Sequence, residues 1–168
     1  SLILVAMSMT LATIGGGLGN KVDAFSTYGT IGGGQSNSVV NNFGTIAGGT
    51  DNVVWESHGF IGGGANNAAK HKSAIAGGDF NSTEELGFIG AGYSNSAGPL
   101  GVVAGGNDNA SVGYAASVLG GASNQAVGDY AMVPGGFGNY ALADYSFAAG
   151  RKARAWEEGT FVWSDSTA

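Results

Sequence analysis

The sequence predicts an all-β fold, a parallel β-solenoid built from coils of about 14 residues. The first observation is a glycine-rich phrase: "TIGGGQSNSV" at 30–39 returns as "TIAGGTDNVV", "FIGGGANNAA" and "AIAGGDFNST". The second is composition, because 33 of the 168 residues are glycine, and each glycine in a helix costs about 1 kcal/mol. The third is the short period, which is too short for a pair of helices but fits two strands and two tight turns.

The repeat is counted from the apolar residue before the glycines, which is position 0 of each coil. Ten such residues follow one another at spacings of 14 to 17, with Phe161 as a degraded eleventh: Ile14, Ile31, Ile46, Ile61, Ile75, Ile89, Val103, Val118, Val133 and Phe147. The extra residues fall between the repeated phrases, so they mark one loop edge of the coil. Position 3 is always glycine, and position 6 is asparagine in nine coils: Asn20, Asn37, Asn52, Asn67, Asn81, Asn95, Asn109, Asn124 and Asn139.

Each repeated position has a predicted role. Residues two apart on a strand share a face, so position 0 is expected to point into the coil, opposite positions 6 and 8 of the second strand. The nine asparagines can form a ladder in which each side chain hydrogen-bonds its copy one coil away. Glycine at position 3 gives the turn a positive φ without steric cost. The glycines are not a phosphate loop, because no Lys-Ser or Lys-Thr follows them.

The first strand of each coil carries no charge on either face. Position −1 holds Thr, Phe, Ala, Val, Ser or Met, and position 1 holds Gly or Ala except at Leu119 and Pro134. The second strand differs, since position 7 includes Lys21 and Arg154. A strand without charge on either face is expected to be buried on both, which one thin coil cannot achieve. The sequence therefore predicts that further copies of the chain cover the first strand.

Composition narrows the classes of function. The net charge of −6 argues against a nucleic-acid partner, and the absence of cysteine excludes disulfides and thiolate chemistry. The apolar start, residues 1–13, is too short for a membrane span and lacks the basic residues of a signal peptide. We interpret it as an N-terminal coil or cap, and we expect no direct membrane insertion by this segment.

The segment "YSFAAGRKARA" at 145–155 and the GG-x-x-N-x-A copies before it form an array of ten. This array resembles the head repeats of trimeric autotransporter adhesins of the YadA type, whose units read roughly S-x-A-x-G-x-x-A-x-A. The resemblance covers about residues 11–155. It implies a left-handed parallel β-roll, three chains around one axis, and extracellular display on a cell surface or fibre tip. Similar heads also occur in phage-tail and other fibre proteins.

We therefore expect β-roll head repeats over 14–155 and a C-terminal cap or junction to the next module over 156–168, where Trp156, Phe161 and Trp163 would close the open end. The expected function is adhesion of a homotrimer to a host, prey or matrix surface ligand, including a glycan. The alternative is a receptor-binding or spacer module of a phage-like tail fibre. An enzyme is not expected, because the repeat shows no paired carboxylates and no nucleophile beside a base, and no cofactor is expected.

One stretch of the loop edge departs from the repeat and is the candidate binding patch. It combines an aromatic, two histidines and five charged residues: Trp55, Glu56, His58, Lys70, His71, Lys72, Glu84 and Glu85. The alternative interpretation is a solvated edge whose charges prevent aggregation. No metal site is expected, because the histidines lack a ligand spacing such as H-x-x-x-H. A second group could stack on sugars or pack laterally: Phe80, Tyr93, Phe137 and Tyr140.

Overall fold

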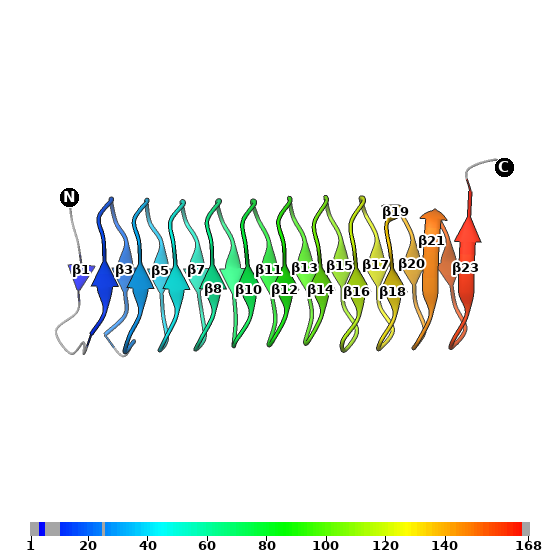
Figure 1. The fold of residues 1–168 in the computed structure, drawn as a ribbon, viewed down its shortest axis with the longest axis horizontal. Helices are drawn as coiled ribbons and strands as arrows, with labels where there is room; N and C mark the ends of the chain where they lie inside the picture. The colour runs from blue at the N-terminus through cyan, green and yellow to red at the C-terminus, as the bar shows by residue number, and fades with distance from the viewer. Residues whose placement is uncertain (1–3, 6–10, 25, 166–168) are drawn as a thin grey trace.

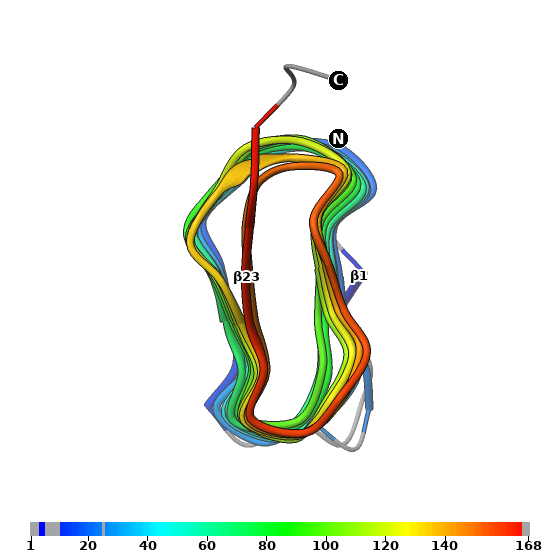
Figure 2. The ribbon, with the colours of Figure 1, turned by 90° about the vertical axis from the view of Figure 1, so that its right-hand side faces the viewer.

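The computed structural model describes residues 4–5, 11–24 and 26–165, and these residues wind into a parallel β-solenoid (Figure 1). Each coil adds one strand to each of two sheets, which face each other across a narrow core (Figure 2). Successive coils advance by 14 to 17 residues, about 15 on average. Among the described residues there is no helix that is long and apolar enough to cross a membrane.

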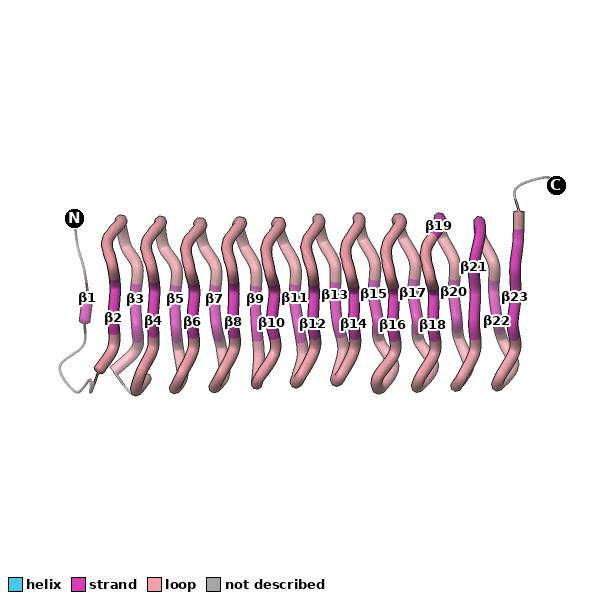
Figure 3. Tube along the Cα trace, in the orientation of Figure 1, coloured by secondary structure: helices cyan, strands magenta, loops and turns pink. Residues whose placement is uncertain are grey.

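Sheet A contains the second strand of each coil, paired in parallel and in chain order: β1 (Leu4–Val5), β3 (Lys21–Val22), β5 (Ser38–Val39), β7 (Val53–Val54), β9 (Ala68–Ala69), β11 (Ser82–Thr83), β13 (Ser96–Ala97), β15 (Ala110–Ser111), β17 (Gln125–Ala126), β20 (Tyr140–Ala141) and β22 (Arg154–Ala155). Figure 3 shows these strands as short segments stacked along one axis. The predicted parallel ladder is therefore confirmed.

Sheet B contains the first strand of each coil and is also parallel: β2 (Thr13–Ile14), β4 (Thr30–Ile31), β6 (Thr45–Ile46), β8 (Phe60–Ile61), β10 (Ala74–Ile75), β12 (Phe88–Ile89), β14 (Val102–Val103), β16 (Ser117–Val118), β18 (Met132–Val133), β21 (Phe147–Arg151) and β23 (Phe161–Ser164). A short strand at the glycine turn, β19 (Gly136–Phe137), pairs with the far end of β21.

The core is filled by the positions that the repeat predicts. Ile61 at position 0 and Val54 at position 8 are fully buried, as are their copies in neighbouring coils. Like residues stack on like residues, because Ile61 pairs with Ile75 and Ile75 with Ile89. Burial of such a side chain contributes about 1.5–3 kcal/mol. Since each coil covers the next, the core is continuous along the axis.

The last coils depart from the predicted register. Counting places Phe147 in the core at position 0, and this prediction was wrong. Phe147 pairs with the outward residue Met132, and Ala148 is buried in its place. Phe161 pairs with Phe147 in the same outward row, is 66% exposed, and stacks on it with ring centroids 4.6 Å apart. A shift of one residue exchanges the two faces of a strand, and the narrow core accepts alanine.

The two ends of the chain are described unequally. At the N-terminus β1 pairs with β3, while most of the predicted cap, residues 1–3 and 6–10, lies outside the described residues. At the C-terminus β23 extends sheet B beyond the last complete coil (Figure 1). Trp156, Phe161 and Trp163 are exposed there. Their role as a cap or as a junction to a following module stays a prediction.

Candidate functional site

The turn after each sheet B strand is held by the asparagine ladder. All nine asparagines are at most 2% exposed. In the middle of the ladder, Asn81 Nδ2 donates to the carbonyl oxygens of Gly77 and Gly92 at 3.1 and 3.0 Å. It also donates to Asn67 Oδ1 at 3.1 Å, while Asn81 Oδ1 accepts from the Asn95 backbone N–H at 3.0 Å. The prediction of an inward ladder bonded from coil to coil is confirmed.

The glycine at position 3 belongs to the same turn. Gly78 has a φ of +85°, a conformation that glycine adopts without steric cost. An added Cβ would overlap the Gly92 carbonyl oxygen of the next coil and lie 2.8 Å from Asn81 Nδ2. This edge of the solenoid, which we call the glycine edge, is therefore fixed by two repeated residues and has little freedom to vary.

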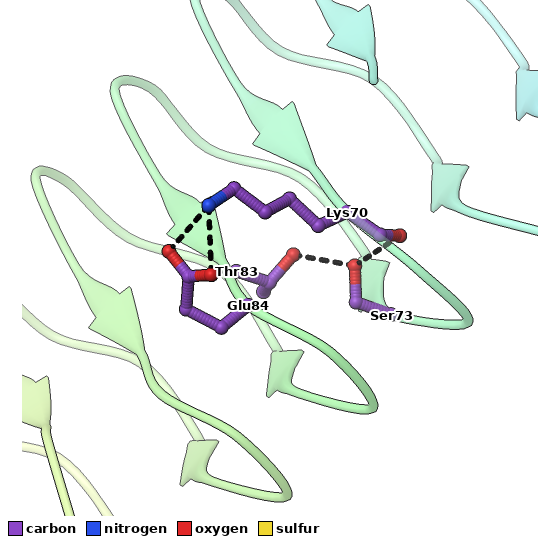
Figure 4. Close-up of polar contacts among 4 residues, drawn as sticks. All are labelled: Lys70, Ser73, Thr83 and Glu84. Atoms are coloured by element: carbon purple, nitrogen blue, oxygen red, sulfur yellow. Dashed lines mark hydrogen bonds and ion pairs between the residues drawn. The ribbon is translucent and has the colours of Figure 1, made fainter. Parts of the chain in front are cut away.

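The opposite edge, the loop edge, carries the candidate binding patch. Trp55, Lys70 and Glu84 occupy equivalent sites on three successive coils, each directly after a sheet A strand. Lys70 Nζ donates to both carboxylate oxygens of Glu84, at 2.9 and 2.7 Å (Figure 4). This hydrogen bond, together with the negative charge of Glu84, raises the pKa of Lys70. Trp55, at the equivalent site one coil earlier, has an exposed ring.

Next to this ion pair, the hydroxyl groups of Ser73 and Thr83 hold the loop in place through hydrogen bonds. Ser73 Oγ donates to the Lys70 carbonyl oxygen at 3.0 Å, and it lies 2.7 Å from Thr83 Oγ1 in the buried interior (Figure 4). The neighbouring coils have glycine at the site of Ser73 and alanine at that of Thr83. The two polar residues thus satisfy each other, and the turn that presents Lys70 and His71 is tied to the core.

The two histidines of the patch lie close together, as their spacing predicts. The His58 and His71 rings meet edge to face with centroids 6.2 Å apart. His58 also stacks on Phe43 of the preceding coil at 4.8 Å. Within the described part of the chain, no three His, Cys, Asp or Glu side chains are grouped so as to hold a metal ion. The remaining patch residues are exposed on the same edge: Glu56, Lys72 and Glu85.

A row of mostly large and exposed side chains on the loop edge was not predicted. Position −3 has a left-handed backbone in ten coils, with φ between 52° and 70°: Leu11, Tyr28, Phe43, His58, Lys72, Leu86, Leu100, Ala115, Tyr130 and Tyr145. We call this row the edge ridge. Its rings stack, with centroids 5.0 Å apart for Tyr28 and Phe43 and 5.3 Å apart for Tyr130 and Tyr145. The only sequence signal is a usually bulky residue three places before position 0. Its residue type changes from coil to coil, so no repeated letter marks the position.

The four aromatic residues that could stack on sugars lie on two other surfaces, the glycine edge and sheet A. Phe80 and Tyr93 lie on the glycine edge with ring centroids 5.5 Å apart and planes tilted by 59°. Phe137 is exposed on the same edge. Tyr140 lies on sheet A, with the Arg154 guanidinium carbon 5.1 Å from its ring centroid. The prediction that these rings bind sugars stays untested.

No protein-family model matches the chain, and no curated protein matches it. The loop edge presents stacked aromatic rings, two imidazoles that meet edge to face, and one ion pair between successive coils. Such an edge is suited to contact with an extended surface, because many weak contacts act together.

Proposed function

We propose that the chain is the head module of a homotrimeric extracellular fibre, which adheres to a surface through its loop edge. The observation that carries the assembly is the outer face of sheet B. Its strand positions contain no charged residue over 13–147. In a single chain this face exposes apolar side chains, including Phe60 at 42%, Phe88 at 43% and Leu119 at 47%. Soluble monomers seldom expose contiguous apolar patches larger than a few hundred Å².

Four glycines just beyond the sheet B strands support the close approach of another chain. Gly33, Gly48, Gly63 and Gly77 at position 2 have a φ outside the left-handed region, and an added Cβ would meet nothing within 4 Å. Neither backbone conformation nor space within one chain requires glycine there. Because glycine has no side chain, it allows another group to approach the backbone closely. We infer that the partner is a second copy, and the resemblance to YadA-type heads favours three copies and a left-handed coil.

The proposed mechanism is passive adhesion. The solenoid is a stiff support, and three-fold symmetry would present the patch at Trp55, His71 and Lys70 three times around the fibre. Linked weak sites gain affinity through a high effective concentration, by a factor of about 10² to 10⁴. Each single site therefore needs only a modest affinity for a glycan or a matrix protein.

The double variant Trp55→Ala with His71→Ala is expected to lower surface attachment at least ~10-fold, because each of the three sites is weakened and avidity multiplies the loss. Attachment is measured on glycan arrays and on surfaces coated with matrix proteins. The matched control is Phe137→Ala with Tyr140→Ala, which removes two rings elsewhere and should leave attachment unchanged. Both variants should keep the assembly and the β-sheet spectrum of the parent.

Three results would change the proposed binding site or the proposed function. If attachment persists without Trp55 and His71 but is lost without Phe137 and Tyr140, the binding site lies away from the loop edge. If the parent protein binds none of these surfaces, a spacer module of a phage-like tail fibre becomes the better assignment. If a bound polysaccharide is depolymerised, the protein is an enzyme.

A further inference from the structure

The exposed turn of the glycine edge carries small or polar residues in most coils, with one exception. Position 5 has a left-handed backbone in each of the ten coils, and its residue is Gly, Ser, Asp, Asn or Lys in nine of them. The exception is Phe80, with a φ of +58°. The next coil carries Tyr93 at position 4, where eight of the ten coils have a residue without a ring. Two aromatic neighbours therefore interrupt this edge.

Neither the backbone nor the core requires a phenylalanine at this site. The left-handed conformation is sterically unfavourable for a bulky residue, and Gly, Asn and Asp adopt it most readily. The ring gains little from burial, since Phe80 and Tyr93 are each 53% exposed. Residues held in such a backbone conformation cluster at ligand-binding and active sites. The two rings are therefore candidates for contact with a ligand.

The relative orientation of the two rings differs from that in the edge ridge. In the ridge, the planes of Tyr130 and Tyr145 are only 3° apart and stacked, so each ring covers a face of the other. The planes of Phe80 and Tyr93 are tilted by 59°, with ring centroids 5.5 Å apart. This tilt leaves more of each ring face uncovered, and an uncovered face offers apolar surface on which a ligand can stack.

Polar groups border the two rings. Asp79 precedes Phe80 in the chain, and Asp79, Tyr93 and Asn107 lie side by side on successive coils through bridge pairs. Asp79 Oδ1 accepts from the backbone N–H of Ala65 at 2.9 Å, which orients the carboxylate. Its second oxygen, Oδ2, has no hydrogen-bond partner among the described residues. That oxygen can accept from a ligand, and the Asn107 amide can both donate and accept.

We propose that Phe80, Tyr93 and Asp79 form a second binding site, which takes the pyranose ring of an uncharged sugar. A pyranose carries C–H groups that pack on an open aromatic face and hydroxyl groups that donate to a carboxylate. Ligand sites commonly combine aromatic surface with a few placed polar groups in this way. The site lies on the edge opposite the loop edge, so it is separate from the patch at Trp55 and does not depend on the proposed adhesion.

The charge of the glycine edge favours a sugar without an acidic group. Asp79 and Asp108 are negative, and each lies one coil away from Tyr93. At positions 4 and 5 the only cations are Arg151 and Lys152, four coils further along. A carboxylate or sulfate on the ligand would therefore meet like charge at this site.

The structure separates this pair from the other two aromatic candidates. The Arg154 guanidinium carbon lies 5.1 Å from the centroid of the Tyr140 ring, so a cation already occupies that ring face. Phe137 pairs with Arg151 of the next coil, so its neighbour is a cation in place of a carboxylate. Neither residue repeats the combination of two tilted rings and an acceptor.

Saturation-transfer NMR titration with the methyl glycosides of galactose, glucose, mannose and N-acetylglucosamine tests the site, because monovalent probes exclude avidity. Phe80→Ser with Tyr93→Asn gives both positions the residue type of the next coil, and we expect it to weaken binding at least ~10-fold without lowering stability. Asp79→Asn keeps the acceptor for Ala65 but removes the second one, and it should weaken binding roughly 10-fold. The matched control is Phe137→Asn, which removes one exposed ring from position 4 and should leave binding unchanged.

Sugar binding that survives Phe80→Ser with Tyr93→Asn overturns the inference, as does a parent protein that binds none of the four glycosides. Binding lost only in Trp55→Ala with His71→Ala places the sugar on the loop edge, which overturns the inference and supports the proposed function. Equal binding of the methyl glycoside of sialic acid overturns the selection for uncharged sugars.

Sedimentation of the Phe80→Ser, Tyr93→Asn variant separates a sugar site from a contact between copies. We expect the variant to keep the association state of the parent, and a smaller species would show that the rings pack against another chain, which overturns the inference. Glycoside binding at these rings by a parent protein that attaches to no surface would support the inference and contradict the proposed function.

Discussion

Replacement of Asn81 by leucine is expected to lower the free energy of unfolding by about 3 kcal/mol, because an unsatisfied buried polar group costs roughly 1–3 kcal/mol and several are created. The carbonyl oxygens of Gly77 and Gly92 lose a donor, and the Asn95 backbone N–H loses its acceptor. These groups lie in a turn whose backbone is fixed by neighbouring coils. The ladder is also broken at its centre, so the coils on either side lose their connection at this edge.

Urea denaturation at a fixed protein concentration measures this effect, since association makes apparent stability depend on concentration. The matched control is Asn107→Leu, an exposed asparagine on the same edge, for which a change within about 0.5 kcal/mol is expected. Equal, small effects of the two substitutions would show that the ladder contributes nothing beyond its neighbours. A large effect of Asn107→Leu would instead point to a general intolerance of this edge.

The double substitution Gly63→Leu with Gly77→Leu is expected to weaken self-association at least ~100-fold, about 2.7 kcal/mol, while each chain stays folded. Leucine side chains at these sites meet no atom of their own chain within 4 Å of the new Cβ. They would occupy the space that we assign to a neighbouring copy. Because glycine is the most flexible residue in the unfolded chain, the substitutions should not destabilise the single solenoid.

The control for this variant carries the same two leucines on the opposite face of the solenoid, as Ser82→Leu with Ser96→Leu. Both serines lie on outward positions of sheet A strands. The control should keep the assembly, and circular dichroism should show the same β-sheet spectrum for both variants. Dissociation by the sheet A variant, with no effect of the sheet B variant, would mean that the copies meet through the other face.

Most of the fold could be predicted because each coil repeats the same local constraints. Ile61 recurs as an aliphatic residue, Asn81 as an asparagine and Gly78 as a glycine, so their roles are visible as columns of one residue type. The register of the last coil was not predicted, because Phe147 looks like a better core residue than Ala148. Side-chain size in the sequence does not show how narrow the core is, and only strand pairing reveals it.

The candidate site was predictable in part. Lys70 and Glu84 are 14 residues apart, one coil in this region, and they form the ion pair that this spacing allows. His58 and His71 are 13 residues apart, so they also lie on neighbouring coils, where their rings meet edge to face. The edge ridge was missed because its members share a backbone conformation and not a chemistry, so no residue type recurs in the column. Local φ values, which a sequence does not display, reveal it.

The assembly is the central claim, and sedimentation equilibrium of the unmodified chain tests it most directly. One chain has a mass of 16.6 kDa. We expect a single species of three times that mass at micromolar concentration. In one chain alone, the uncharged outer face of sheet B and the glycines at position 2 would stay exposed to solvent. A homogeneous species of 16.6 kDa at the same concentration would contradict this account.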